Sequence, residues 1–224
     1  MNIEPIQKNI HLNWQKPIKS AYRNAEKRFD ALYSLYLRKV HLMNLEEKQL
    51  SAEYMYKGKI INLRRDKALL PNGNTATREV VEHNGGVCVA ALTDNDEVLF
   101  VRQFRYPYME VIPEIPAGKR DSAEEDPLQC GIRELKEETG ATAEKFIPLG
   151  KLYPSPGYCG EIIWMYAATG LSYGEQNPDD DEFLTVEKIS LNKAVEMILS
   201  GEITDAKTQA AVLKLKVLKD QGKL

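Results

Sequence analysis

The spacing of apolar side chains changes along this chain, and the changes predict where helices give way to strands. Between residues 17 and 40, apolar side chains recur every three or four positions, which predicts one amphipathic helix. From about residue 44 onward, short alternating runs separated by turn sequences predict β-strands. Strands are expected at 51–56, 60–66, 77–82, 86–92, 97–102, 146–153, 161–168 and 184–189, and helices at 127–139, 191–200 and from 205 onward. This mixture predicts a layered α/β fold with a mixed β-sheet sandwiched between helices.

The first 43 residues differ in charge from the rest of the chain. They hold eight Lys or Arg against three acids, a net charge of +5, so the whole-chain value of −3 leaves −8 for residues 44–224. We expect a basic helical extension at 1–43 and a main domain at 44–224, which divides into an N-terminal β-hairpin part (44–84) and a core (85–224). The extra amphipathic helix has three interpretations: it binds a partner, it lies on a membrane surface, or it is an accessory or poorly ordered extension.

Composition excludes several classes of protein. The chain has 224 residues, of which 43% are hydrophobic and 28% charged, as in soluble globular proteins. Its weakly acidic balance gives no reason to expect nucleic acid as a partner. No apolar run approaches the ~20 residues that span a bilayer, and Cys88, Cys130 and Cys159 are too widely spaced for a disulfide framework or zinc site. We therefore expect a cytoplasmic protein with reduced thiols.

The candidate chemistry lies on the helix predicted at 127–139. Glu134, Glu137 and Glu138 are spaced so that they share one face of it, where like charges repel by roughly 0.2–0.5 kcal/mol per pair. One interpretation is a solvated acidic face balanced by neighbouring basic residues. The other is a site for Mg²⁺, which prefers carboxylate oxygens. The second is favoured by Gly118, since a loop that contains glycine lets a backbone carbonyl such as that of Ala117 approach a metal.

This segment resembles the Nudix box: a glycine, five residues, Glu, seven residues, then Arg-Glu-aliphatic-x-Glu-Glu-x-Gly-aliphatic. The second half of the box is matched by Arg133, Glu134, Leu135, Glu137, Glu138, Gly140 and Ala141. The preceding loop is one residue longer than the standard box, because Glu125 has the right spacing to Arg133 whereas Glu124 has the right spacing to Gly118. Either glutamate could fill the loop position.

Three further matches resemble the ADP-ribose pyrophosphatase branch of the Nudix hydrolases. Pro156 stands sixteen residues after Gly140, where that branch carries a proline. The segment 102–107, Arg-Gln-Phe-Arg-Tyr-Pro, resembles the stretch that precedes the box in that branch, and 201–208 resembles the start of its last helix. The resemblance covers roughly residues 48–218 and does not include the N-terminal helix.

The resemblance implies a catalytic core of Nudix fold that hydrolyses the diphosphate bond of ADP-ribose, or of a related nucleoside diphosphate sugar, to AMP and ribose 5-phosphate. It implies Mg²⁺, with Mn²⁺ as an alternative, held by the Ala117 carbonyl, Glu134, Glu137 and Glu138, with Arg133 orienting the glutamates. It also implies a homodimer whose N-terminal hairpins cross between subunits. There are two alternatives to this function: the substrate is another nucleoside diphosphate derivative, or the protein is a non-catalytic nucleotide sensor.

The resemblance also implies roles for residues outside the box. Tyr54 or Tyr56 would stack on adenine, although both suit a structural role in the sheet equally well. Arg102 and Arg105 would hold phosphate or the terminal ribose, and Pro156 belongs to the substrate pocket. Two acids remain open from the residues alone: Glu161 reaches the site or is an edge charge, and Glu182, in the acidic loop at 174–182, is a candidate general base beside the box glutamates.

We predict that a truncation lacking residues 1–43 separates the interpretations of the basic helix. If the helix is an accessory extension, hydrolytic activity, oligomeric state and cellular distribution stay unchanged. If it binds a partner or a membrane, at least one of these properties changes. Activity assays, light scattering and fractionation of the truncated and full chains measure the difference.

Overall fold

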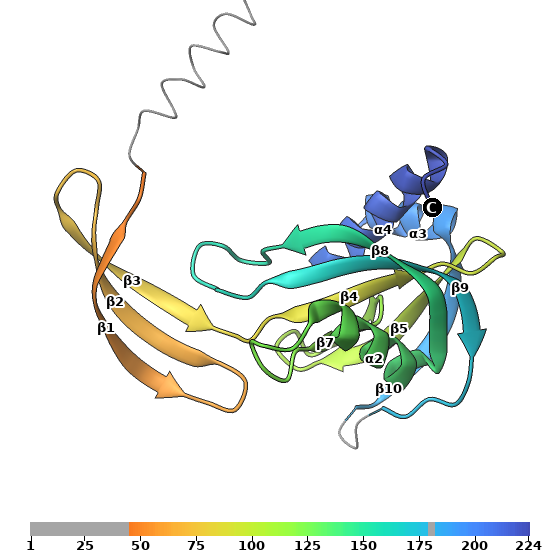
Figure 1. Cartoon of the computed structure of the whole chain (residues 1–224), viewed down its shortest axis with the longest axis horizontal. Helices are drawn as coiled ribbons and strands as arrows, with labels where there is room; N and C mark the ends of the chain where they lie inside the picture. Colours follow the sequence, from red (N-terminus) through yellow and green to blue (C-terminus); the bar gives the residue numbers. More distant parts are fainter. Residues whose placement is uncertain (1–44, 179–181) are drawn as a thin grey trace, which may run out of the picture. The chain divides into compact units, whose positions relative to one another are not determined.

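The structure is a computed structural model that describes residues 45–178 and 182–224 (Figure 1). The helix expected at 17–40 and the three aspartates of the acidic loop, Asp179, Asp180 and Asp181, lie outside these residues. Contacts divide the chain into two units, one of residues 1–48 with 69–76 and the other of residues 49–68 with 77–224. The described part of the first unit contains a turn in which Leu70 N–H donates to Asn74 O (2.8 Å) and Gly73 N–H donates to Leu70 O (2.9 Å).

The described residues form ten strands and three helices. The strands are β1 (Lys48–Lys57), β2 (Asn62–Leu69), β3 (Thr75–Glu82), β4 (Gly86–Ala91), β5 (Glu97–Arg105), β6 (Glu110–Glu114), β7 (Ala117–Lys119), β8 (Ala141–Leu152), β9 (Ile163–Tyr173) and β10 (Leu184–Ser190). The helices are α2 (Pro127–Thr139), α3 (Leu191–Ser200) and α4 (Ala206–Asp220). The expected mixed α/β fold is confirmed, and β6 and β7, which no alternation in the sequence marked, are additional strands.

The centre of the fold is a four-stranded mixed sheet in the order β7-β4-β9-β8. Strand β4 runs parallel to β9 and antiparallel to β7, and all six of its residues are buried. Because successive side chains of a strand point to opposite faces, Val89 and Ala91 pack with Leu135 of α2, whereas Cys88 and Ala90 belong to the core that includes Leu215 of α4. The sheet therefore lies between α2 and α4 (Figure 1).

Helix α2 begins and ends as its sequence predicts. The side chain of Asp126 caps its start by accepting hydrogen bonds from Leu128 N–H and Gln129 N–H, both at 3.0 Å. Gly140 ends it in the left-handed conformation, with φ 69°. In its first half, Gly131 lets the helix approach β4, because a Cβ built there would lie 3.0 Å from Val87 Cγ2 and 3.3 Å from Val89 Cγ2.

A second, three-stranded antiparallel sheet has the order β10-β5-β6. The chain leaves β6 at Glu114 and enters β7 at Ala117, so the segment 114–118 runs from this sheet into the central one. Its course is held by two backbone partners: Val89 N–H donates to Pro116 O (2.9 Å), and Cys88 pairs with Ala117. The segment 114–118 therefore places backbone groups directly beside α2.

The third sheet, in the order β1-β2-β3, carries a largely exposed surface. All ten residues of β1 are exposed, and among them are Leu50, Tyr54, Met55 and Tyr56. The strands are joined by polar side chains, since Gln49 donates to Asp66 (2.8 Å) and Arg64 pairs with both Asp66 and Glu82. These apolar side chains of β1 therefore lie on the surface of the sheet and not in a core.

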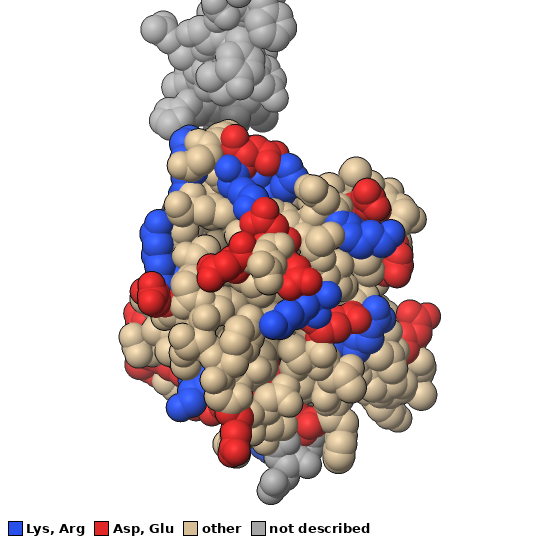
Figure 2. Space-filling view, turned by 90° about the vertical axis from the view of Figure 1, so that its right-hand side faces the viewer, with Lys and Arg blue, Asp and Glu red and all other residues tan. Residues whose placement is uncertain are grey.

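Charged side chains of both signs are interspersed over the face drawn in Figure 2, and neither sign forms a continuous field on it. In the described part of the chain, no helix is both long and apolar enough to cross a membrane.

We predict that Gly131→Val weakens the fold, whereas the same change at Gly157 does not. The new side chain at residue 131 would overlap the valines of β4, and overpacking of this kind costs about 1–3 kcal/mol of unfolding free energy. At Gly157 a Cβ meets nothing within 4 Å, so Gly157→Val should stay within about 0.5 kcal/mol of the wild type. Urea unfolding of the three proteins measures both values, and equal losses would show that the α2–β4 approach is not tightly packed.

Candidate functional site

Two carboxylates of α2 are buried against the segment 114–118. Glu134 is 7% exposed and Glu138 only 1%. A Cβ built at Gly118 would overlap the carboxylate of Glu134, so the side chain of Glu134 lies where a larger residue at 118 would displace it. The backbone N–H of Ala117 donates to Glu138 Oε2 (3.0 Å). Two of the three acids predicted as metal ligands, Glu134 and Glu138, therefore share one strip of backbone, which includes the carbonyl of Ala117.

Burial raises the pKa values of the Glu134 and Glu138 carboxyl groups. Loss of water, together with the charges of Glu134 and Glu182, raises the pKa of Glu138 to about 8, against the opposing hydrogen bond from Ala117 N–H. Burial likewise raises the pKa of Glu134 to about 7, although the nearby Arg133 lowers it. Glu182 is thus close enough to act on both groups electrostatically, as expected for a member of the same site.

Arg133 lies among the acids. Its Nη1 is 2.8 Å from Glu134 Oε1 and 2.8 Å from Glu137 Oε2. Its Nη2 is 3.5 Å from Glu125 Oε1, and Glu125 Oε2 accepts a hydrogen bond from Asp121 N–H (2.7 Å). Glu124 is exposed. In the longer loop it is therefore Glu125, and not Glu124, that faces Arg133.

The donor set suits a hard divalent cation. The carboxylates of Glu134, Glu137 and Glu138 and the carbonyl of Ala117 are all oxygen donors. The single positive charge of Arg133 does not neutralise three carboxylates. Within residues 45–178 and 182–224, however, no three acidic, histidine or cysteine side chains are already grouped to hold a metal. The guanidinium of Arg133 stands between Glu134 and Glu137 instead, so the chemistry of the residues fits a metal while their present rotamers favour the arginine.

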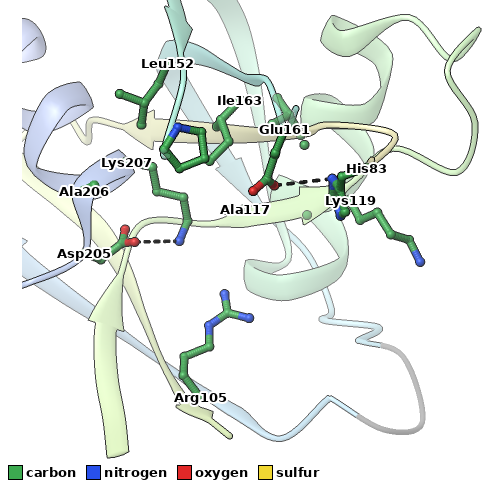
Figure 3. A pocket seen from close by; sticks show the side chains of 14 residues that line it. His83, Arg105, Ala117, Lys119, Leu152, Glu161, Ile163, Asp205, Ala206 and Lys207 are labelled. Atoms are coloured by element: carbon green, nitrogen blue, oxygen red, sulfur yellow. Dashed lines mark hydrogen bonds and ion pairs between the residues drawn. The ribbon is translucent and has the colours of Figure 1, made fainter. Parts of the chain in front are cut away.

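A cavity of about 350 Å³ opens beside Ala117 and Gly118 (Figure 3). Its walls come from β4, β5, β7, the loop before β9 and the start of α4. The lining residues are His83, Gly86, Val87, Arg105, Ala117, Gly118, Lys119, Leu152, Pro154, Glu161, Ile163, Asp205, Ala206 and Lys207. Three cations, Arg105, Lys119 and Lys207, line the cavity together with two acids, Glu161 and Asp205, and the cations are the groups that an anionic ligand would contact.

The Arg105 guanidinium is held by a buried acid. Glu114, 2% exposed, accepts two hydrogen bonds from Arg105, one from Nε (2.6 Å) and one from Nη2 (2.7 Å). Burial alone would raise the pKa of Glu114, but Arg105 and Lys207 together hold it below its ordinary value. Such a two-point pair fixes the plane of the guanidinium at the cavity wall.

The predicted site residues divide into two groups. Arg133, Glu134, Glu137, Glu138 and Ala117 come together at α2 and β7, with Glu182 nearby, and Arg105 and Glu161 line the cavity. The other four do not reach it. Arg102 pairs with Glu187 (2.8 Å), Pro156 is exposed while Pro154 lines the cavity, and Tyr54 and Tyr56 are exposed on β1.

Most lining residues were not anticipated from the sequence, and three of them, His83, Asp205 and Lys207, carry ionisable side chains that pair with one another or with a predicted residue. His83 accepts a hydrogen bond from Gly85 N–H through Nδ1 (3.0 Å) and has Glu161 at 3.5 Å. Asp205 and Lys207 form an ion pair at the start of α4 (3.1 Å). Lys207 did carry a signal, because a cation in the first turn of a helix faces the positive end of the helix dipole and needs a compensating reason to be there.

Comparison with known proteins agrees with this geometry. Residues 82–212 match the family described as the NUDIX domain, and residues 47–81 match the nucleoside diphosphate sugar hydrolase N-terminal domain. The chain belongs to the Nudix family.

Similar proteins match nearly their whole length to this Nudix protein. An ADP-ribose pyrophosphatase of Bacillus subtilis is 41% identical over 178 residues, which are 79% of this chain and 96% of that protein. A methanol dehydrogenase activator of Bacillus methanolicus is 40% identical over 77% of this chain and 94% of its own length. A crystal structure of an ADP compounds hydrolase shares the fold with a TM-score of 0.69 at 20% identity, covering 80% of this chain and 97% of that one.

We predict that the metal-free Nudix protein loses stability as the pH rises. Glu138 binds its proton more tightly in the folded than in the unfolded state, so folding is favoured below its ordinary pKa of 4.5, and that advantage disappears between 4.5 and about 8. In Glu138→Gln the amide cannot ionise, and thermal unfolding should depend less on pH over this window. A wild type and a Glu138→Gln variant with the same pH dependence would show that this carboxyl is not held in its neutral form.

Proposed function

We propose that this Nudix protein hydrolyses the diphosphate bond of ADP-ribose, or of a related nucleoside diphosphate sugar, to AMP and ribose 5-phosphate. The observation that carries the proposal is the adjacency of buried Glu134 and Glu138 to a cavity whose wall holds cations. The first feature suits a metal that binds phosphate, and the second suits the diphosphate itself. The proposal agrees with the name of the Bacillus subtilis relative, which matches over most of both chains.

Nudix hydrolases generally use a divalent metal, and we propose Mg²⁺, with Mn²⁺ as an alternative. The carbonyl of Ala117 and the carboxylates of Glu134 and Glu138 would hold it, with Glu137 as a further ligand. When bound, such an ion neutralises the diphosphate and activates water for attack on phosphorus. The raised pKa values of Glu134 and Glu138 support this assignment, since burial disfavours both negative charges more than Arg133 and the Ala117 N–H favour them, and a divalent cation would supply the missing positive charge.

The residues of the chain would do the rest. Arg105 would bind the diphosphate, while its carboxylate partner Glu114 keeps the guanidinium in place. Arg133, now paired with Glu134 and Glu137, would orient these acids. Glu182, which acts electrostatically on both buried carboxylates, would accept the proton of the attacking water.

We also propose that the chain forms a homodimer through β1 and its neighbours. This strand exposes Leu50, Tyr54, Met55 and Tyr56, which are better covered by protein than by water. In such a dimer Tyr54 or Tyr56 would contact the adenine bound by the partner subunit, and Arg102 and Pro156 would take part once that subunit is in place. A cytoplasmic location and the absence of nucleic acid as a partner belong to the same proposal.

If the substrate is a different nucleoside diphosphate derivative, the proposed metal site and diphosphate contacts stay the same and only the shape of the sugar pocket differs. A non-catalytic sensor is less well supported, because buried carboxylates cost folding free energy and a module that only binds nucleotide has no need of them. The two alternatives differ in turnover, which one experiment measures.

We predict that, in the presence of Mg²⁺, the protein releases AMP from ADP-ribose faster than it hydrolyses other nucleoside diphosphate sugars or diadenosine polyphosphates. In Glu138→Gln the turnover should fall at least about 100-fold while the protein stays folded, because one charge leaves the proposed metal shell. Glu144→Gln, which removes an exposed carboxylate of β8, is the matched control and should keep wild-type turnover. Preference for another compound would overturn the substrate assignment, and ligand binding without any turnover would support the sensor.

A further inference from the structure

Glu114 is shared between two cations that come from distant parts of the chain. Arg105, on the neighbouring strand β5, donates to both of its oxygens, and Lys207, from the first turn of α4, donates to Oε2. The carboxylate is 2% exposed, so it lies away from bulk water, whereas the side chain of Arg105 is 37% exposed. Lys207 itself is 12% exposed and has Asp205 as a second partner at 3.1 Å.

The position of Lys207 is unfavourable for stability alone. Burial opposes its charge, and the start of α4 presents the positive end of the helix dipole. Its pKa is nevertheless raised, because Asp205 and Glu114 outweigh the loss of water. A buried ion pair as a whole is often no more stabilising than apolar residues of similar volume, so stability alone does not account for this cluster, although removing Lys207 by itself would leave Glu114 with one cation fewer.

The arrangement affects the charge that Arg105 can offer to a ligand. Arg105 uses Nε and Nη2 for Glu114, and among the described residues none accepts a hydrogen bond from its Nη1. In Figure 3 the ends of the Arg105 and Lys207 side chains point toward one another across the cavity. Lys207 offsets part of the negative charge of the Glu114 carboxylate. Glu114 therefore reduces the positive electrostatic potential of Arg105 in the cavity less than it would without Lys207.

The same turn of α4 also holds the backbone beside Glu114. The hydroxyl of Thr208, which is fully buried, accepts a hydrogen bond from Ile115 N–H (3.0 Å) and donates to Asp205 Oδ2 (2.6 Å). Asp205 in turn caps the helix by accepting from Thr208 N–H (2.9 Å). The start of α4 is therefore attached to both Glu114 and Ile115, which fixes where the Glu114 carboxylate lies.

We propose that Lys207 is a positioning residue for phosphate recognition: through the Glu114 carboxylate that it shares with Arg105, it holds the guanidinium at the cavity wall and keeps its charge available to a diphosphate. This inference rests on the proposed function, which assigns the diphosphate to Arg105. It adds a residue that acts through another side chain rather than by contact with the reacting atoms.

The test compares Lys207→Met with Lys214→Met. Lys214 lies on the same helix and donates to Leu149 O (2.7 Å), so its loss removes a lysine hydrogen bond without touching Glu114. In Lys207→Met the KM for ADP-ribose should rise about 10-fold, in line with the loss of one charge-assisted contact, while kcat changes less than about threefold. Lys214→Met should leave both constants unchanged. Thermal unfolding identifies any variant that is not folded, and Lys207→Gln replaces Lys207→Met if that one is not.

A double-mutant cycle with Glu114→Gln tests the route of the effect. If Lys207 acts through Glu114, then Lys207→Met should add almost nothing to the KM of the Glu114→Gln variant, because the shared carboxylate is already gone. Equal effects of Lys207→Met in both backgrounds would overturn the proposal. So would an unchanged KM in Lys207→Met, or an equal rise in Lys214→Met.

Binding measurements separate this proposal from the proposed function. Calorimetry without divalent cation gives the Kd of ADP-ribose, and of inorganic pyrophosphate, for the wild type and each variant. If the wild type binds ADP-ribose but hydrolyses nothing, the proposed function fails, and the role of Lys207 is decided by whether Kd rises in Lys207→Met alone. A wild type that binds neither compound overturns both proposals.

Discussion

The carboxylates of Glu134 and Glu138 are buried against the backbone of residues 117 and 118, and much of the surrounding structure serves to hold them there. A carboxylate in this position loses its water, so it must be approached closely by polar groups. The N–H of Ala117 supplies one, and the bare Cα of Gly118 leaves space for the other acid. The helix that carries both acids must in turn lie close to β4, which Gly131 allows.

The segment 114–118 connects this acidic site with the cationic cavity. At one end Glu114 is paired with Arg105 and Lys207, and at the other Ala117 contacts Glu138. Opposite charges are therefore arranged on either side of one short stretch of backbone, the acids where a divalent metal would bind and the cations where phosphate would. A shift of this segment would affect both halves of the site together, which explains why strands β4 and β6 and helix α4 all attach to it.

Membership of the Nudix family accounts for the main domain, since the matched families cover residues 47–212. Within that frame this chain has features of its own. Its box loop is one residue longer, and the structure resolves the ambiguity in favour of Glu125, which faces Arg133 while Glu124 is exposed. The loop keeps its glutamate near Arg133 because the backbone of Glu125 is held by Arg120, whose Nε donates to Glu125 O (2.9 Å).

The local pattern of the sequence was enough to predict helix α2 over residues 127–139, and the shared face of Glu134, Glu137 and Glu138. These features depend on neighbours within four residues, so spacing alone determines them. The short strands β6 and β7 were not predictable in this way, because their partners β5 and β4 are the reason that they are extended.

Only the tertiary structure decided which distant side chains meet. Arg105 and Lys207 stand about a hundred positions apart and share one carboxylate, whereas Arg102, three positions before Arg105, turns to Glu187 instead. The alternation of a strand explains the difference between neighbouring residues, but the register of β5 against β6 and β10 decides which acid each arginine finds. The sequence by itself determined the acidic face of one helix. The pairing of strands and the docking of α4 determined the cavity beside it, because long-range contacts fix the position of groups that no local pattern relates.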